Sequence, residues 1–253
     1  MEPSFSGARL KIERANQHIN ELDSSIQRFI NTNPYSIIIE KDPNSGNNVL
    51  GFDATKPLPR EVTATLGDAI HNLRAALDLA VWDAICCAGG TPTRDSCLPF
   101  GDTEDSLITA VNKRLKKIAS KDICDLIIQG IKPYKGGNDA LYGLHRLDIM
   151  DKHQKPIITI KVVRLDSVRA RDSRNNVIDG CSFLVRGNGV LHAISGLGDL
   201  KIESYGKVAL QVFFGNGLPY EGEPVIPTLK QLSELVSGIV DKFENLMVAL
   251  SKP

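Results

Sequence analysis

Residues 144–153 concentrate side chains that could do chemistry. The segment reads Leu-His-Arg-Leu-Asp-Ile-Met-Asp-Lys-His and holds two of the five histidines of the chain. An imidazole takes up or releases a proton near neutral pH, and a neighbouring cation stabilises negative charge that develops on a phosphate. The pattern therefore predicts a site for acid–base or phosphate chemistry, with His145, Arg146, Asp148, Lys152 and His153 as its candidate residues.

The spacing of these residues on a helix is compatible with two alternative sites. His145, Asp148 and Lys152 share a face, whereas Asp151 is expected to point elsewhere. Two histidines and an aspartate are ligand types that suit zinc, iron or manganese. Alternatively, His153 acts as a general acid or base for metal-free phosphodiester cleavage, and Arg146 stabilises the phosphate charge, a role that Arg74 or Lys152 could also take.

A second segment, residues 67–78, reads Gly-Asp-Ala-Ile-His-Asn-Leu-Arg-Ala-Ala-Leu-Asp. On a helix its leucine and isoleucine side chains form one apolar stripe, whereas His71, Arg74 and Asp78 lie on a separate stripe. Arg74 and Asp78 are four residues apart and can form an ion pair. Asp68 and His71 have the carboxylate-x-x-His spacing that helical metal sites use.

These two segments support three hypotheses. The first is a hydrolase-like enzyme that acts on RNA or another phosphodiester, with its site between the two helices. The second uses the same residues as ligands and gives a metal-dependent hydrolase. The third is a non-enzymatic interaction or regulatory protein in which the cluster is a structural polar network. No motif for a nucleotide cofactor follows a strand and opens a helix, so a divalent metal is the one cofactor left open.

Three motifs carry a resemblance to known proteins. They are GDxxHNLRxxLD at residues 67–78, IKPYxGG at 131–137 and LHxLDxxDKH at 144–153. Together with the Leu-Pro-Phe at 98–100, they resemble a family of bacterial and phage proteins without an assigned activity, over about residues 35–160. The spacing of Arg146 and His153 is also similar to that of HEPN ribonucleases. That resemblance implies a helical domain that cleaves RNA without metal, usually as a homodimer.

The elements that must position these residues follow from periodicity and turn residues. Apolar residues three and four apart predict helices over 7–32, 60–88, 139–153 and 227–250. Thr103 is expected to cap a helix that ends near 119, and Ser120 or Asp122 a helix that ends near 130. Strands are expected at 35–40 and 48–52, as a hairpin, and at 157–163, 181–185, 190–194, 199–203 and 207–214.

This element order predicts an α+β fold. We expect a helical core with an N-terminal β-hairpin, a C-terminal antiparallel sheet and a terminal amphipathic helix. The whole chain, residues 1–253, is expected to form a single domain. Its helical portion would cover about 1–156, and its β-rich portion with the terminal helix about 157–253.

Composition narrows the class of protein. A hydrophobic fraction of 42% and a net charge of zero, from 30 basic and 30 acidic residues, are typical of a globular chain and exclude a uniformly basic nucleic-acid binder. Five cysteines without a CxxC pair argue against a disulfide framework. No apolar run is long enough for a membrane span and no signal peptide is evident, so we expect a cytoplasmic protein.

Two basic clusters are expected to be mainly solvated faces: Lys113, Arg114, Lys116, Lys117 and Lys121, and Arg164, Arg169, Arg171, Arg174 and Arg186.

Overall fold

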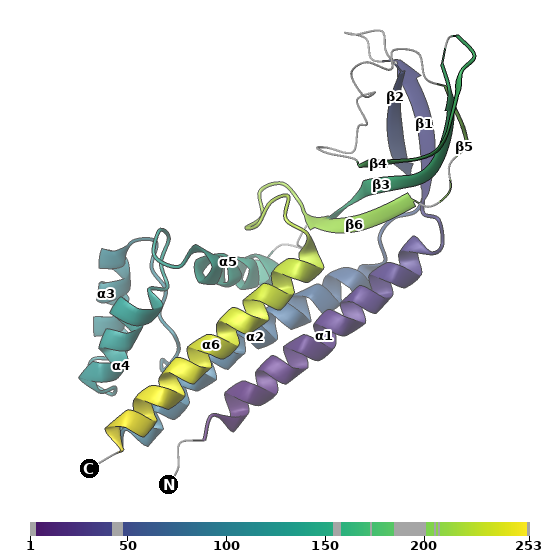
Figure 1. The fold of residues 1–253 in the computed structure, drawn as a ribbon. Helices are drawn as coiled ribbons and strands as arrows, with labels where there is room; N and C mark the ends of the chain where they lie inside the picture. The colour runs from purple at the N-terminus through teal and green to yellow at the C-terminus, as the bar shows by residue number, and fades with distance from the viewer. Residues whose placement is uncertain are drawn as a thin grey trace. The chain divides into compact units, whose positions relative to one another are not determined.

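The computed structural model describes residues 4–41, 48–153, 158–172, 174–184, 201–204, 206 and 208–251 (Figure 1). It confirms the predicted α+β class. Helices form most of the described chain, and they are accompanied by an N-terminal hairpin and a small antiparallel sheet near the C-terminus. The terminal amphipathic helix is also present.

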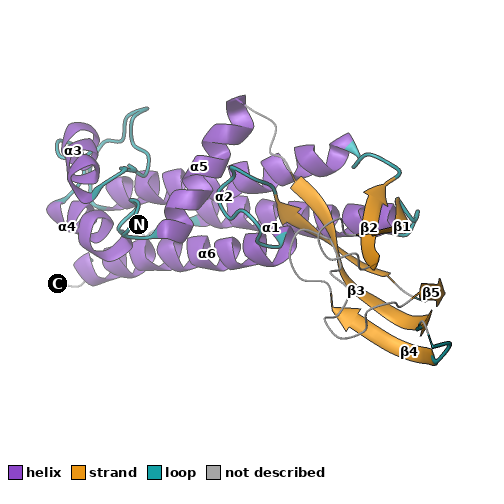
Figure 2. Cartoon of the chain, turned by 90° about the horizontal axis from the view of Figure 1, so that it is seen from above, coloured by secondary structure: helices purple, strands orange, loops and turns teal. Residues whose placement is uncertain are grey.

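Three long helices lie side by side: α1 (Ser6–Ile30), α2 (Arg60–Cys87) and α6 (Val225–Leu250) (Figures 1 and 2). In α2 the alanines at 69, 76, 80 and 84 are fully buried, which lets neighbouring elements approach the helix closely. Arg9 of α1 forms ion pairs with Asp241 and Glu244 of α6, each at 2.6 Å. None of the helices in the described part of the chain is long and apolar enough to span a membrane.

Shorter helices occupy the middle of the chain. They are α3 (Glu104–Arg114), α4 (Lys121–Asp125), the π-helical segment η1 (Leu126–Ile131) and α5 (Asp139–His153). The predicted caps at Thr103 and Ser120 are confirmed, because each side chain accepts a hydrogen bond from a backbone N–H of the first turn. However, α3 ends earlier than predicted, at Arg114. The left-handed backbone of Lys132, with φ of 56°, ends η1.

The strands form two separate antiparallel arrangements. In the hairpin, β1 (Tyr35–Lys41) pairs with β2 (Asn48–Ala54). In the second sheet β3 (Ile158–Arg171) pairs with β4 (Val177–Leu184), β5 (Lys201–Ser204) and β6 (Val208–Phe214). The predicted strand at 190–194 lies outside the described residues. β3 continues well beyond the predicted end at 163, past a register shift between Leu165 and Val168.

The chain divides into two compact units. One contains Met1–Asp23, Glu61–Ile157 and Phe214–Pro253, and the other contains Ser24–Arg60 and Ile158–Phe213. The terminal helix α6 falls in the first unit with α2 and α5, and the hairpin falls in the second unit with the C-terminal sheet. The expectation of a single domain stays a prediction. All the site residues proposed from the sequence lie in the first unit.

Candidate functional site

The helices α2 and α5 bring the two sequence motifs together. His71 contacts Asp148, and one turn further along α2 Arg74 lies against Phe100, which stacks on His145. In the other direction Gly67 lies against Asp151. Because the partner number falls along α5 as the residue number rises along α2, the two helices run in opposite directions. We call these residues of the two helices, with Phe100 between them, the α2–α5 contact.

His71 and Asp148 form a hydrogen-bonded pair across this contact. Nδ1 of His71 lies 3.1 Å from Oδ1 of Asp148. The two side chains differ in exposure, since His71 is 56% exposed and Asp148 only 5%. An ionised carboxylate can only accept a hydrogen bond, so Nδ1 carries the hydrogen in the neutral imidazole. Nε2 of His71 is then left with its lone pair, as an acceptor on an exposed ring.

Arg74 and Asp78 form the predicted ion pair, and both also bind the loop before α3. Nη2 of Arg74 donates to the carbonyl of Leu98 at 3.1 Å, and the N–H of Leu98 donates to Oδ1 of Asp78 at 2.9 Å. Arg74 is only 8% exposed. These contacts use both charged side chains to position the loop, which favours a structural role for them.

Phe100 connects the two helices and was not a site residue in the sequence analysis. The guanidinium carbon of Arg74 lies 4.7 Å from the centre of its ring. On α5, the ring of His145 stacks on Phe100 with 4.1 Å between centroids and an interplanar angle of 11°. Nδ1 of His145 is buried. Stacking and burial therefore fix the orientation of this imidazole.

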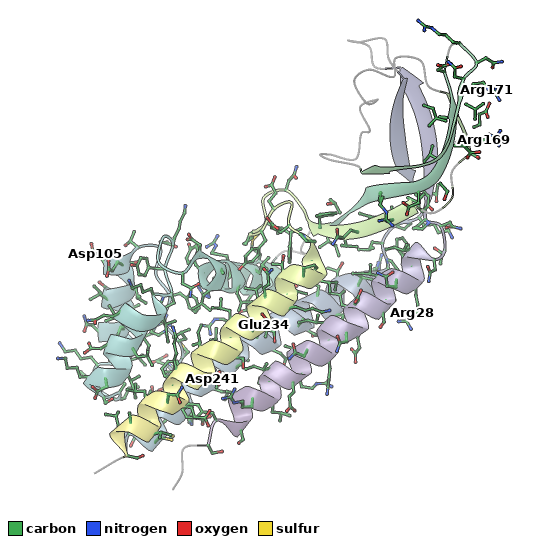
Figure 3. All side chains as sticks on the ribbon, in the orientation of Figure 1. Arg28, Asp105, Arg169, Arg171, Glu234 and Asp241 are labelled. Carbon is green, nitrogen blue, oxygen red and sulfur yellow. The ribbon has the colours of Figure 1, made fainter. Side chains whose placement is uncertain are left out.

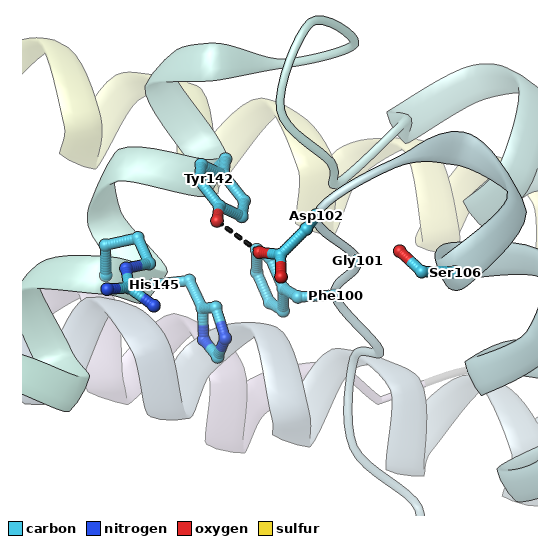
Figure 4. Close-up of a pocket in the computed structure, with 7 residues that line it drawn as sticks. Phe100, Gly101, Asp102, Ser106, Tyr142 and His145 are labelled. Carbon is cyan, nitrogen blue, oxygen red and sulfur yellow. Dashed lines mark hydrogen bonds between the residues drawn. The ribbon is translucent and has the colours of Figure 1, made fainter.

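A pocket of about 290 Å³ opens beside His145 (Figure 4). The loop and the start of α3 contribute Phe100, Gly101, Asp102 and Ser106, and α5 contributes Tyr142, His145 and Arg146. The hydroxyl of Tyr142 donates a hydrogen bond to Asp102, which raises the pKa of Tyr142 above its ordinary value. Arg146 is exposed and forms no ion pair with another described residue. The pocket thus offers one available cation among polar groups.

Tyr220 fixes the beginning of α5. Its hydroxyl donates a hydrogen bond to the carbonyl of Ala140, and burial raises its pKa well above the ordinary value. The ring lies over Gly143, where an added Cβ would be 2.6 Å from the Tyr220 hydroxyl oxygen. The absence of a side chain at Gly143 is therefore what lets Tyr220 pack against α5 next to the pocket.

Three further residues from the sequence motif lie at the C-terminal end of α5. Lys152 and His153 end the helix, but their side chains lie outside the described residues, so the acid–base role of His153 stays a prediction. The expectation that Asp151 points elsewhere was wrong. Its carboxylate lies against α2, because Asp151 is three residues from Asp148 and so falls near the same side of the helix.

The metal-dependent hypothesis requires several ligating side chains that are close enough to bind one metal ion. Across the part of the chain that the structure describes, no three His, Cys, Asp or Glu residues are placed to hold one metal ion together. Among the described side chains, His71 and Asp148 form a hydrogen-bonded pair. The metal-dependent alternative therefore stays a prediction.

No protein-family model, curated protein or solved structure matches this chain. The resemblances to a bacterial and phage family and to HEPN ribonucleases therefore stay predictions, and the function must be argued from the site itself.

Proposed function

We propose that the protein is a hydrolase-like enzyme that cleaves a phosphodiester bond in RNA. The observation that carries the proposal is the pair formed by His71 and Asp148, in which an exposed imidazole is held by a buried carboxylate. An exposed ion pair loses side-chain freedom for little gain, whereas this pair fixes both the tautomer and the direction of one ring. That is the arrangement a general base requires.

RNA is the substrate class that this base can use directly. Nε2 of His71 would accept the proton of a ribose 2′-hydroxyl, whose oxygen attacks the adjacent phosphorus. The bond to the 5′-oxygen breaks, and this oxygen takes a proton from solvent. The products are a 2′,3′-cyclic phosphate and a free 5′-hydroxyl. Asp148 acts as a positioning residue, because it touches His71 and not the substrate.

Arg146 is the candidate phosphate ligand. It lines the pocket on α5, two residues before Asp148, which is a rise of only about 3 Å along the helix axis. Residues two apart on a helix point to different sides of it, so Arg146 is close to the His71–Asp148 pair along α5 but does not share its face. Arg74 is the weaker candidate because its guanidinium is buried and already bound.

The test is cleavage of labelled single-stranded RNA in EDTA by the purified protein. Replacing His71 with glutamine should lower kcat by about 10²-fold or more, the usual contribution of a general base. Asp148→Asn should lower kcat with little change in KM, since the base is misoriented and substrate binding is retained. Arg146→Gln should raise KM as well.

His18 supplies a matched control. It also pairs with a carboxylate, Glu21, at 3.3 Å, but both belong to α1 and Glu21 is 63% exposed. His18→Gln should cleave RNA like the wild-type protein. Wild-type protein that leaves RNA intact in EDTA contradicts the metal-free reaction, and activity that appears only with added zinc or manganese supports the metal-dependent alternative.

A second candidate function follows from the contacts of Arg74, Asp78 and Phe100. These side chains bind a loop and a second helix, which is what the non-enzymatic hypothesis expects of a structural polar network. That hypothesis predicts that Asp148→Asn lowers the free energy of unfolding while no RNA cleavage is seen with any variant. Measuring stability and cleavage on the same preparations separates the two functions.

A further inference from the structure

The turn between α3 and α4 carries a cluster of positive charge. Residues 113–121 contain five basic side chains and no acidic one. All five are exposed, and none forms an ion pair with a residue that the structure describes. We call this surface the basic corner, and its residues are Lys113, Arg114, Lys116, Lys117 and Lys121.

Helix stability explains only part of this cluster. Lys113 and Arg114 lie in the last turn of α3, where a positive charge complements the helix dipole. Lys116 and Lys117 follow the end of that helix. Lys121 occupies the first position of α4, where the dipole favours a negative charge. The dipoles of the two helices therefore do not explain the position of Lys121.

The basic residues of β3 make a useful contrast. Arg169 and Arg171 are both close to Glu203, and Arg169 also lies near Asp179 (Figure 3). Each of these two arginines therefore has a carboxylate beside it. The basic corner lacks such partners among the described residues, so its field remains available to an external anion.

The side chains of the basic corner favour nucleic acid over a membrane surface as its binding partner. A helix that binds a membrane surface inserts apolar side chains beside its cations. Leu115 is buried here, and none of the large exposed hydrophobic side chains in the described part of the chain falls within residues 113–121. Exposed aromatic rings for base stacking are also lacking in this segment. Such a surface suits contacts to a phosphate backbone without sequence preference.

The pocket and the basic corner lie at opposite ends of α3. Ser106 lines the pocket in the first turn of α3, and Asp105 marks that end of the helix (Figure 3). The basic corner begins at the other end of the same helix. Eleven residues of helix span roughly 16 Å, a distance that a short stretch of RNA can cover.

We propose that the basic corner binds the phosphate backbone of RNA and holds the strand whose phosphodiester is cleaved near His71. The inference rests on the proposed function for the identity of the substrate. The binding itself requires only the exposed cations. It should therefore persist in a protein that cannot cleave.

The test is binding of a fluorescent single-stranded RNA of mixed sequence to full-length His71→Gln protein in EDTA, over a range of salt concentrations. Five phosphate contacts predict a slope of log affinity against log salt of about −3.5. Replacing Lys116 and Lys117 together with glutamine should reduce the steepness of that slope by about 1.4 and weaken binding on the order of tenfold at moderate salt. Both lysines are exposed, so the fold should be unaffected.

A double replacement of Lys56 and Lys230 with glutamine removes the same charge elsewhere and should leave binding unchanged. The inference is overturned if RNA does not bind, or if both double variants bind equally. It is also overturned if the protein binds vesicles rich in anionic lipid and not RNA. RNA binding without cleavage by the wild-type protein would retain the basic corner and reject the proposed reaction.

Discussion

The α2–α5 contact and the arginines of β3 use the same chemical groups in opposite surroundings. In the first, Arg74 is buried and binds both Asp78 and the backbone carbonyl of Leu98. In the second, Arg169 and Arg171 lie on an exposed strand face around Glu203. Water can replace a lost partner at β3 but not at Arg74. The same type of ion pair should therefore contribute differently to stability in the two regions.

Arg74→Ala tests the buried side of this comparison and should have the largest effect. It removes the partner of Asp78, the donor to Leu98 and the contact with Phe100. We expect the free energy of unfolding to fall by about 2–4 kcal/mol, because buried polar groups lose their partners. Trp82, the single tryptophan, lies on α2, so its fluorescence in urea reports on this unit.

Arg9→Ala is the matched control for that measurement. Arg9 belongs to the same unit and pairs with two carboxylates, but its side chain is 37% exposed. Exposed ion pairs typically contribute about 1 kcal/mol or less. If the Arg9 and Arg74 variants lose equal stability, burial does not determine how much these two arginines stabilise the protein.

Gly67→Ala tests how closely α2 and α5 approach. An added Cβ would lie 2.5 Å from Oδ2 of Asp151, so the carboxylate or the helix must shift. We expect a loss of about 1–3 kcal/mol, as in other overpacked sites. Urea unfolding followed by Trp82 fluorescence measures it, and the loss should be smaller when Asp151 is also replaced with alanine.

Gly238 gives the opposite expectation for the same substitution. It lies within α6, and nothing is within 4 Å of a Cβ added there. Gly238→Ala should therefore stabilise the protein by about 0.5–1 kcal/mol, the usual gain in a helix interior. A Gly67 variant that gains stability like the Gly238 variant would show that α5 does not press on α2 at this point.

Local sequence signals predicted most of the helices. The bounds of α2 and α5 differ from the prediction by one residue or less, because apolar periodicity and flanking glycines or prolines are properties of the segment itself. β3 was predicted too short. Its second half alternates buried Val168 and Ala170 with Arg169 and Arg171, but a register shift between Leu165 and Val168, with Ser167 at φ of 54°, interrupts the alternation before it.

The site was predictable in its residues but not in its pairing. His71 and Asp148 were both candidates from the sequence, yet they are 77 residues apart, and their contact depends on how α5 packs against α2. Phe100, Asp102 and Tyr142 were missed as site residues. Two of them lie in a loop without periodicity, and Tyr142 acquires its role only through the hydrogen bond to Asp102.

Glu203→Gln tests the exposed side of the comparison and should have the smallest effect. The substitution removes the charge near Arg169 and Arg171 but retains an amide oxygen that can accept the hydrogen bond from Nε of Arg171. Water solvates whatever is left unpaired, since the glutamate side chain is 30% exposed and Arg169 is 48% exposed. Amide hydrogen exchange of β3 should therefore be unchanged within error, at low and at high salt. Faster exchange along β3 in the variant would show that these exposed pairs stabilise the sheet, and that burial is not what separates the β3 arginines from Arg74.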